Sequence, residues 1–242
     1  MNSEKAVVFD LDDTLIDSNY KYLGANIEAC RVIFRALGTQ APAPEAILSK
    51  QFLLDREAVE AAPVGEKFSA DRFPRAWVQT YLHFAALLGL PVSENICDDV
   101  FSAANRALIP PYRLVPGAVA ALREIQRAGY TMIMLTIGAE HVQRRKIART
   151  GLARFFDEVW IEPAGKEAAL TAIGFMHASG AVMAGNSMRS DINPAIRAKL
   201  QAVHIPRSTW RREAEEPAGA YHLCPSIREL PALLRTILTP TA

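Results

Sequence analysis

Between residues 116 and 204, short apolar segments alternate with segments in which apolar residues recur at helical spacing. Short apolar segments of this kind suit buried parallel strands, and their alternation with helices predicts right-handed strand–helix–strand units. The fold class that follows is α/β, with a doubly wound parallel sheet and a Rossmann-like core. The predicted strands are 131–135, 158–161, 181–184 and 201–204, and the predicted helices are 118–128, 140–150, 166–178 and 192–199. The tail is predicted to hold a loop at 208–217, a short strand at 221–223 and a helix at 230–238.

The first strand of this sheet is predicted at 7–9, and residues 17–113 after it show only helical patterns. Within that block, apolar spacing predicts a helix that ends before Gly38, followed by helices at 45–61, 73–90 and 93–108, with Ser93 as the N-cap of the last. The sequence therefore predicts an all-helical cap domain, residues 17–113, inserted into a core of residues 1–16 and 114–242. The cap is expected to lie over the carboxyl ends of the strands.

Carboxylates crowd the chain directly after the first predicted strand, at Asp10, Asp12 and Asp13. Strand propensity does not explain them, because Asp is depleted in strands. Crowded carboxylates repel one another unless protons or a cation compensate their charge, and Mg²⁺ prefers oxygen ligands of this kind. Asp10 also falls at the carboxyl end of its strand, where open α/β sheets bind their ligands. The pattern favours a ligand and cation site over an ordinary Asp-rich turn.

Other polar residues stand at corresponding places later in the chain. Thr136 follows the strand at 131–135, and Lys166 begins a predicted helix. Asn186 and Asp191 follow the strand at 181–184. Each signal is weak by itself, because Thr is a common helix cap, Lys is usually a surface residue and Asn-Ser is ordinary turn chemistry. Their order along the chain, each beside a predicted strand, is the more specific observation.

Taken together, these segments resemble the four motifs of the haloacid dehalogenase-like hydrolases, in the family's order. The resemblance covers 5–15 and 116–204, and the helical block between the first two motifs resembles the helical cap of one type in the family. It implies that Asp10 is the nucleophile that attacks phosphorus. It implies that Asp12 protonates the leaving oxygen and then activates water to hydrolyse the aspartyl-phosphate.

The resemblance further implies that Thr136 and Lys166 bind the phosphate, and that the cofactor is Mg²⁺. The implied metal ligands are Asp10, the backbone carbonyl of Asp12, Asn186 and Asp191. Asn186 stands where the family usually has Asp, so the site loses one negative charge and weaker metal binding is expected. The family often has Asn after its second-motif Thr, where this chain has Ile137, and Pro after its Lys, where this chain has Glu167.

The predicted function is Mg²⁺-dependent hydrolysis of small-molecule phosphate monoesters through an aspartyl-phosphate, which is phosphatase activity. A 2-haloacid dehalogenase on the same fold is an alternative, but attack on carbon needs neither a metal nor an acid two residues after the nucleophile, so Asp12 and Asp191 argue against it. A phosphomutase is a second alternative. A non-catalytic protein that binds a phosphorylated ligand is a third, and the joint presence of Asp10, Asp12, Lys166 and Asp191 argues against it.

Composition limits the partners of the chain. Its 242 residues include 27 basic and 26 acidic side chains, which gives no bulk attraction to nucleic acid or to an anionic membrane. No apolar segment approaches the ~20 residues of a membrane helix, and the first strand leaves no room for a signal peptide. Cys30, Cys97 and Cys224 are expected to be free thiols in a reducing compartment. We expect a cytoplasmic monomer or homodimer whose partner is a small phosphorylated metabolite.

Several basic side chains have no predicted part in the chemistry. The histidines show no ligand spacing, and His141, although close to Thr136 in sequence, is expected on a helix surface. In the predicted cap, Arg56, Arg72 and Arg75 are candidates to meet a second anionic group, but solvated surface is the expected place for each.

Overall fold

The computed structural model describes residues 5–63, 65–208 and 215–238, so part of the predicted tail loop, 209–214, lies outside the described residues. The chain divides into two compact units. The first consists of Met1–Asn19 and Tyr112–Ala242, and the second is Tyr20–Pro111. The division falls close to the boundaries predicted after residues 16 and 113. The role of the second unit as a cap stays a prediction.

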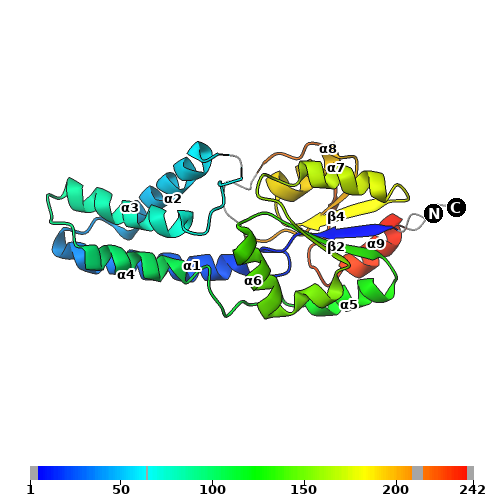
Figure 1. Ribbon diagram of the computed structural model, residues 1–242, viewed down its shortest axis with the longest axis horizontal. Helices are drawn as coiled ribbons and strands as arrows, with labels where there is room; N and C mark the ends of the chain where they lie inside the picture. The colour runs from blue at the N-terminus through cyan, green and yellow to red at the C-terminus, as the bar shows by residue number, and fades with distance from the viewer. Residues whose placement is uncertain (1–4, 64, 209–214, 239–242) are drawn as a thin grey trace. The chain divides into compact units, whose positions relative to one another are not determined.

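A six-stranded sheet forms the centre of the first unit (Figure 1). The order across it is β3-β2-β1-β4-β5-β6, and every neighbouring pair of strands is parallel. The observed strands are β1 (Ala6–Phe9), β2 (Thr131–Thr136), β3 (Glu158–Ile161), β4 (Ala181–Gly185), β5 (Gln201–His204) and β6 (His222–Leu223). The predicted doubly wound α/β fold is confirmed, and no strand end differs from its prediction by more than one residue.

Helices cover both faces of this sheet (Figure 1). One face packs against α5 (Ala118–Arg127), α9 (Leu230–Leu238), the 3₁₀ helix η2 (Leu152–Phe155) and Ile147 of α6 (Glu140–Thr150). The other packs against α7 (Glu167–Met176) and α8 (Asn193–Arg197), the latter preceded by a π-helical turn, Met188–Ile192. Both α7 and α8 are shorter than predicted. Lys166 occupies the N-cap of α7, and Lys199, just after α8, has a left-handed φ of 60° that a helix cannot continue.

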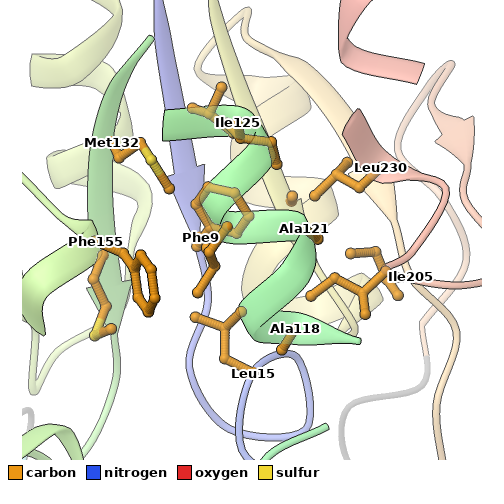
Figure 2. Close-up of a cluster of buried hydrophobic side chains, with 14 of the residues drawn as sticks. Phe9, Leu15, Ala118, Ala121, Ile125, Met132, Phe155, Ile205 and Leu230 are labelled. Atoms are coloured by element: carbon orange, nitrogen blue, oxygen red, sulfur yellow. The ribbon is translucent and has the colours of Figure 1, made fainter. Parts of the chain in front are cut away.

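The buried core reflects the alternation of side chains along each strand. On β1, Val7 and Phe9 face the cluster shared with α5 and α9, whereas Ala6 and Val8 face the cluster shared with α7 and α8. Figure 2 shows the first cluster, in which Phe9 lies beside α5. Because both faces are covered, every residue of β1 is apolar, as expected for a central parallel strand.

The second unit is built from helices around its own apolar core. They are α1 (Ser18–Leu37), whose first two residues belong to the first unit, a 3₁₀ turn η1 (Gly38–Gln40), α2 (Pro44–Ala61), α3 (Arg72–Leu87) and α4 (Glu94–Asn105). Trp77 is fully buried in this core, and its indole N–H donates to Asn26 Oδ1 at 3.1 Å. The three cysteines are free thiols, as expected. No helix of the described residues has the length and apolarity that crossing a membrane requires.

The predicted ends of two helices in this unit are wrong. Helix α3 ends at Leu87 rather than residue 90 because Gly89 takes a left-handed φ of 65°, and Leu90 N–H bonds to Ala85 O at 2.9 Å in a Schellman-type stop. Helix α4 ends at Asn105 rather than residue 108 because the backbone hydrogen bonds there join residues three apart instead of four, as in a 3₁₀ helix. Ser93 occupies the predicted N-cap position, but its side chain accepts no capping hydrogen bond.

The three candidate arginines of this unit are paired with carboxylates. Arg56 and Arg75 are exposed and pair with acidic residues one helical turn away, which agrees with the expected surface role. Arg72 differs from the prediction, since only 13% of its side chain is exposed and it forms an ion pair with Asp55 of α2. This pair links α2 to α3, so Arg72 has a structural partner within its own unit.

Candidate active site

The carboxyl ends of three strands carry the polar residues of the predicted site. Asp10 directly follows β1, Thr136 ends β2, and Asn186 directly follows β4. Since β1 lies between β2 and β4, these residues share one edge of the sheet. The order of the strands reverses at β1, and such a switch point is where open α/β sheets bind their ligands.

Lys166 joins two of the predicted carboxylates. Its Nζ donates to Asp10 Oδ1 and to Asp191 Oδ1, both at 2.6 Å. All three side chains are buried, with Asp10 7%, Lys166 2% and Asp191 1% exposed. The structure thus brings Asp10 together with two residues that lie more than a hundred positions further along the chain. Two other lysines of the first unit do not take this place, since Lys199 is exposed and Lys146 contacts Asp12 instead.

A π-helical turn after β4 positions Asp191. Its Oδ2 accepts a hydrogen bond from the backbone N–H of Ser187 at 2.9 Å, so both carboxylate oxygens of Asp191 have donors. Gly185 lies against this carboxylate, and a Cβ at that position would overlap it. The close approach explains why β4 ends in glycine.

The buried cluster holds two carboxylates against one ammonium group. Burial raises the pKa of Asp10 to about 7 against the opposing effect of Lys166, and the Asp191 and Asp12 carboxylates add to the rise. For Lys166, burial alone would lower the pKa, but Asp10 and Asp191 outweigh it and the pKa lies above its ordinary value. The ammonium group therefore stays charged, and Asp10 is the carboxylate whose charge is less well compensated.

The second oxygen of Asp10 is poised for a ligand. Asp10 Oδ2 is buried, and within the described part of the chain no donor reaches it. A buried carboxylate oxygen without a partner is costly, so such an atom commonly marks a place for an ion or a reacting group. Nearby in the fold, Thr14 Oγ1 donates to Asn186 Oδ1 at 3.2 Å, which fixes the buried carboxamide and leaves its oxygen a second lone pair.

These donors fit a hard divalent cation, although their total charge is low. No group of three or more His, Cys, Asp or Glu side chains in the described residues is arranged to hold a metal ion. Mg²⁺ does not require one, because it is commonly bound through one or two carboxylates and keeps several waters. The carboxylate of Asp10 and the carboxamide of Asn186 are oxygen donors of that kind. Asp191 is already engaged by Lys166 and by the Ser187 N–H.

Asp12 is held separately, by side chains from two helices. Lys146 Nζ of α6 donates to Oδ1 at 2.7 Å and to Oδ2 at 2.9 Å, and Gln143 Nε2 donates to Oδ2 at 2.8 Å. The Ser18 hydroxyl also donates to Oδ1. Burial alone would raise the pKa of Asp12, but the Lys146 charge and these hydrogen bonds hold it below its ordinary value.

Thr136 and Asp12 share a single donor. Gln143 Nε2 lies 2.7 Å from Thr136 Oγ1, so one amide links the predicted phosphate-binding hydroxyl to the predicted acid–base group. The sequence prediction omits both Gln143 and Lys146. Their signal in the sequence is a spacing of three on a helix that begins shortly after Thr136, which places both on one helix face.

His141 is exposed on α6, as expected. His204, at the end of β5, has Nε2 3.0 Å from the backbone carbonyl oxygen of Asn186. This contact ties the loop after β4 to the neighbouring strand.

Asp13 gives a prediction for the pH dependence of stability. It has a left-handed φ of 61°, its Oδ1 accepts from the Asn19 N–H at 2.7 Å, and burial raises its pKa from 3.8 to about 7. Because the folded state holds this proton more tightly, ionised Asp13 lowers the free energy of unfolding as pH rises through that interval. Asp13→Asn keeps the acceptor and tolerates the left-handed φ. We expect its melting temperature to exceed that of the native protein by more at about pH 8 than at about pH 5. An equal difference at both pH values would contradict this account.

Curated relatives share part of this sequence. An uncharacterized protein in the fgs 3′ region of Lacticaseibacillus casei is 26% identical over 162 residues, which cover 63% of this chain and 59% of that protein. A phosphoserine phosphatase of Thermus thermophilus is 33% identical over 113 residues, which cover 43% of this chain and 45% of that protein. The chain thus spans about half the length of these relatives.

Solved structures share the fold over nearly the whole chain. A haloacid dehalogenase-like hydrolase from Xanthomonas campestris has a TM-score of 0.72 at 19% identity, covering 97% of this chain and 96% of that one. The HAD-hydrolase YfnB from Bacillus subtilis, bound to magnesium, has a TM-score of 0.60 at 19% identity, with coverage of 98% and 99%. L-2-haloacid dehalogenase from Xanthobacter autotrophicus has a TM-score of 0.58 at 20% identity, with coverage of 96% and 98%.

The family comparison covers most of the chain. The model of the haloacid dehalogenase-like hydrolases matches residues 4–199, a span that contains Asp10, Thr136, Lys166 and Asp191. The fold of the solved relatives, the parallel sheet and the clustering of these side chains at its carboxyl edge agree with that match. The chain belongs to the haloacid dehalogenase-like hydrolases.

Proposed function

We propose that this hydrolase is a Mg²⁺-dependent phosphatase that acts on small phosphorylated metabolites through an aspartyl-phosphate at Asp10. The observation that carries the proposal is the buried Asp10 carboxylate, with one oxygen on Lys166 and the other without a partner among the residues that the structure describes. A carboxylate nucleophile needs one oxygen fixed and one oxygen open to the electrophile, and splitting the displacement into two steps makes each easier.

The proton that Asp12 gives up in the first step is recovered from water in the second. In the first, Asp10 Oδ2 bonds to phosphorus, the bond from phosphorus to the leaving oxygen breaks, and Asp12 gives that oxygen a proton. In the second, Asp12 takes a proton from water as the water attacks phosphorus and the Asp10–phosphorus bond breaks. A phosphate dianion beside Asp12 favours its protonated form, since like charge opposes ionisation, which prepares Asp12 for the first step.

The remaining residues bind the phosphate and the cation. The Thr136 hydroxyl donates to a phosphate oxygen, and the Lys166 ammonium group offsets negative charge on the phosphate. Mg²⁺, when bound, supplies further charge stabilisation and orients the phosphate. The residues proposed to hold it are Asp10, Asp12 through its backbone carbonyl, Asn186 and Asp191.

The relatives support phosphoryl transfer without settling the substrate. The phosphoserine phosphatase of Thermus thermophilus acts, by its name, on a phosphate monoester, and the Bacillus subtilis structure contains magnesium. The solved dehalogenase shares the fold alone. A dehalogenase that attacks carbon needs no acid–base group two residues after the nucleophile. The Asp12 carboxylate, held by Lys146 and Gln143, would have no function in that reaction. We therefore place phosphatase activity before dehalogenase activity, and propose a cytoplasmic protein that is a monomer or homodimer.

A substrate panel tests this proposal. Purified protein is assayed for phosphate release from p-nitrophenyl phosphate, phosphoserine, glycerol phosphates and sugar phosphates, with Mg²⁺ and with a chelator. Release that requires Mg²⁺ is the expected result. Metal-independent halide release from chloropropionate would instead identify a dehalogenase. Movement of the phosphate group within a sugar phosphate, without release of free phosphate, would identify a mutase. Absence of turnover together with absence of tight Mg²⁺-dependent uptake of trifluoroberyllate would favour a binding protein, whereas tight uptake favours an enzyme.

The carboxamide at Asn186 yields a prediction for metal affinity. Asn186→Asp keeps the oxygen that accepts from Thr14 and adds a negative charge beside the proposed cation. We expect the dissociation constant for Mg²⁺, measured by calorimetry without substrate, to fall by about tenfold. Gln126→Glu, an exposed position on α5, is the control for the added charge. If the two variants had equal affinity for Mg²⁺, Asn186 would not be a ligand.

A further inference from the structure

Two polar side chains of α6 are buried, although most other polar residues of this arginine-rich helix are exposed. Gln143 and Lys146 are 2% and 5% exposed. Burying a lysine or a glutamine is costly unless its polar atoms find partners. Both side chains find one in the same place, because both donate to the Asp12 carboxylate. This pair of α6 residues is therefore organised around one functional group on another element.

The orientation of the Gln143 amide follows from its neighbours. Its Nε2 lies 2.8 Å from Asp12 Oδ2, 2.7 Å from Thr136 Oγ1 and 2.9 Å from the backbone oxygen of Ile137. The carboxylate and carbonyl oxygens are acceptors only, so the amide nitrogen must face them. The reversed amide would bring Oε1 against two acceptors, which excludes it on chemical grounds.

The backbone between β2 and α6 accommodates this side chain. Gly138 has a φ of 146°, which L-residues with a side chain rarely adopt. A Cβ at Gly138 would also lie 3.1 Å from Gln143 Cδ. The turn after Thr136 is thus shaped so that Gln143 can fold back over it and reach Thr136 and Asp12 together.

We propose that Gln143 and Lys146 are positioning residues that hold Asp12 for proton transfer, an inference that rests on the proposed phosphatase function. Lys146 contacts both carboxylate oxygens and so fixes the plane of the group. Gln143 fixes one of those oxygens relative to the Thr136 hydroxyl, which binds the phosphate in the proposed mechanism. The pair sets the distance between the acid–base group and the phosphate, and it acts through Asp12.

The two proton transfers of Asp12 give this role a kinetic signature. Departure of an alkoxide depends on the proton from Asp12, whereas p-nitrophenolate, a good leaving group, departs without it. A misplaced Asp12 therefore slows the first step for alkyl phosphates. For p-nitrophenyl phosphate it slows the second step, and the aspartyl-phosphate accumulates. General loss of structure would lower both rates alike and produce no such accumulation.

The test uses Lys146→Met and Gln143→Met in the full-length protein with Mg²⁺. For the alkyl phosphate that the native protein hydrolyses fastest, we expect kcat to fall by about 10²-fold while KM changes little, since misplacement by about 1 Å costs that much. For p-nitrophenyl phosphate we expect the first turnover to stay fast and steady turnover to fall, which gives a burst of p-nitrophenolate, with phosphorylated protein detected by mass spectrometry after an acid quench. Lys146→Arg should recover part of kcat. Arg149→Met removes an exposed cation from the same helix and is the matched control.

A double-variant comparison separates positioning from stability. The double variant Asp12→Asn/Lys146→Met should have a kcat less than about threefold below that of Asp12→Asn alone. The effects of residues that act through one group are strongly non-additive. Absence of both the p-nitrophenolate burst and the phosphorylated protein, or a full additional loss in the Asp12→Asn background, would overturn the positioning role and leave the phosphatase proposal standing. Absence of phosphate release by the native protein with every monoester would overturn both.

Discussion

Asp10→Asn is expected to abolish phosphate release without lowering the melting temperature of the protein. Asp10 supplies the oxygen that bonds to phosphorus in the proposed mechanism, and an amide cannot take that role. Removing a nucleophile from a covalent mechanism costs on the order of 10⁶-fold in kcat, so turnover should fall at least about 10³-fold even if a minor route survives.

The expected stability follows from the two oxygens of Asp10. Oδ1 accepts from Lys166, and Oδ2 is buried with no donor among the described residues. In the variant, the amide oxygen can keep the Lys166 contact while the NH₂ group replaces the unpartnered Oδ2. The substitution also removes one of two buried negative charges that face a single ammonium group. We therefore expect the melting temperature to stay the same or rise.

Asp191→Asn is the matched comparison, because Asp191 belongs to the same cluster but has donors on both oxygens. An Asn there offers only one acceptor, so its NH₂ group must face either Lys166 or the Ser187 N–H. Leaving a buried donor unpaired costs about 1–3 kcal/mol, and Asp191→Asn should be destabilised by that amount in urea unfolding. If Asp10→Asn instead lost as much stability as Asp191→Asn, Asp10 Oδ2 would have a hydrogen-bond donor in the native protein, which would contradict the structure. Native-like turnover by Asp10→Asn would rule out the proposed nucleophile.

The sheet is predictable from the sequence because its strands are buried on both faces. A parallel strand covered by helices on each side reads as a continuous apolar segment, and β1 with Ala6 and Val8 on one face and Val7 and Phe9 on the other is such a segment. Helix ends are harder to predict, because they depend on backbone stops. Gly89 ends α3 through its left-handed φ, and the apolar spacing that predicts the helix continues beyond it.

The candidate site divides in the same way. Asp10, Thr136 and Asn186 are predictable as neighbours because each stands at the carboxyl end of a parallel strand, and those ends share one edge. Gln143 and Lys146 are not, because a polar residue on a helix is usually a surface residue. Only the fold brings Asp12 against the face of α6 that carries Gln143 and Lys146. The hydrogen bonds to Asp12 then compensate the burial of these two side chains. The same holds for Arg72, whose buried partner Asp55 lies on another helix.

Lys166→Met is expected to cause the largest loss of stability of any single substitution considered for this protein. The Lys166 ammonium group donates to both Asp10 Oδ1 and Asp191 Oδ1. Its removal leaves two buried carboxylates facing each other with no cation between them. Breaking a buried ion pair by removing one partner costs about 3–5 kcal/mol, and we expect a loss in that range in urea unfolding at neutral pH. Lys199→Met, at an exposed lysine, should stay within about 0.5 kcal/mol of the native protein.

The pH dependence of that loss identifies its cause. Without Lys166, the folded-state pKa of Asp10 rises further above that of the unfolded chain, because burial and repulsion by the Asp191 carboxylate are no longer opposed. Protons then bind more tightly to the folded state, so the variant should regain stability as pH falls toward about 4 and lose it as pH rises. Adding Asp10→Asn to Lys166→Met removes one of the two opposed charges and should restore part of the stability at neutral pH. A loss that is independent of pH and unaffected by the second substitution would mean that Lys166 contributes through packing of its aliphatic chain, and not through the charge it places between two carboxylates.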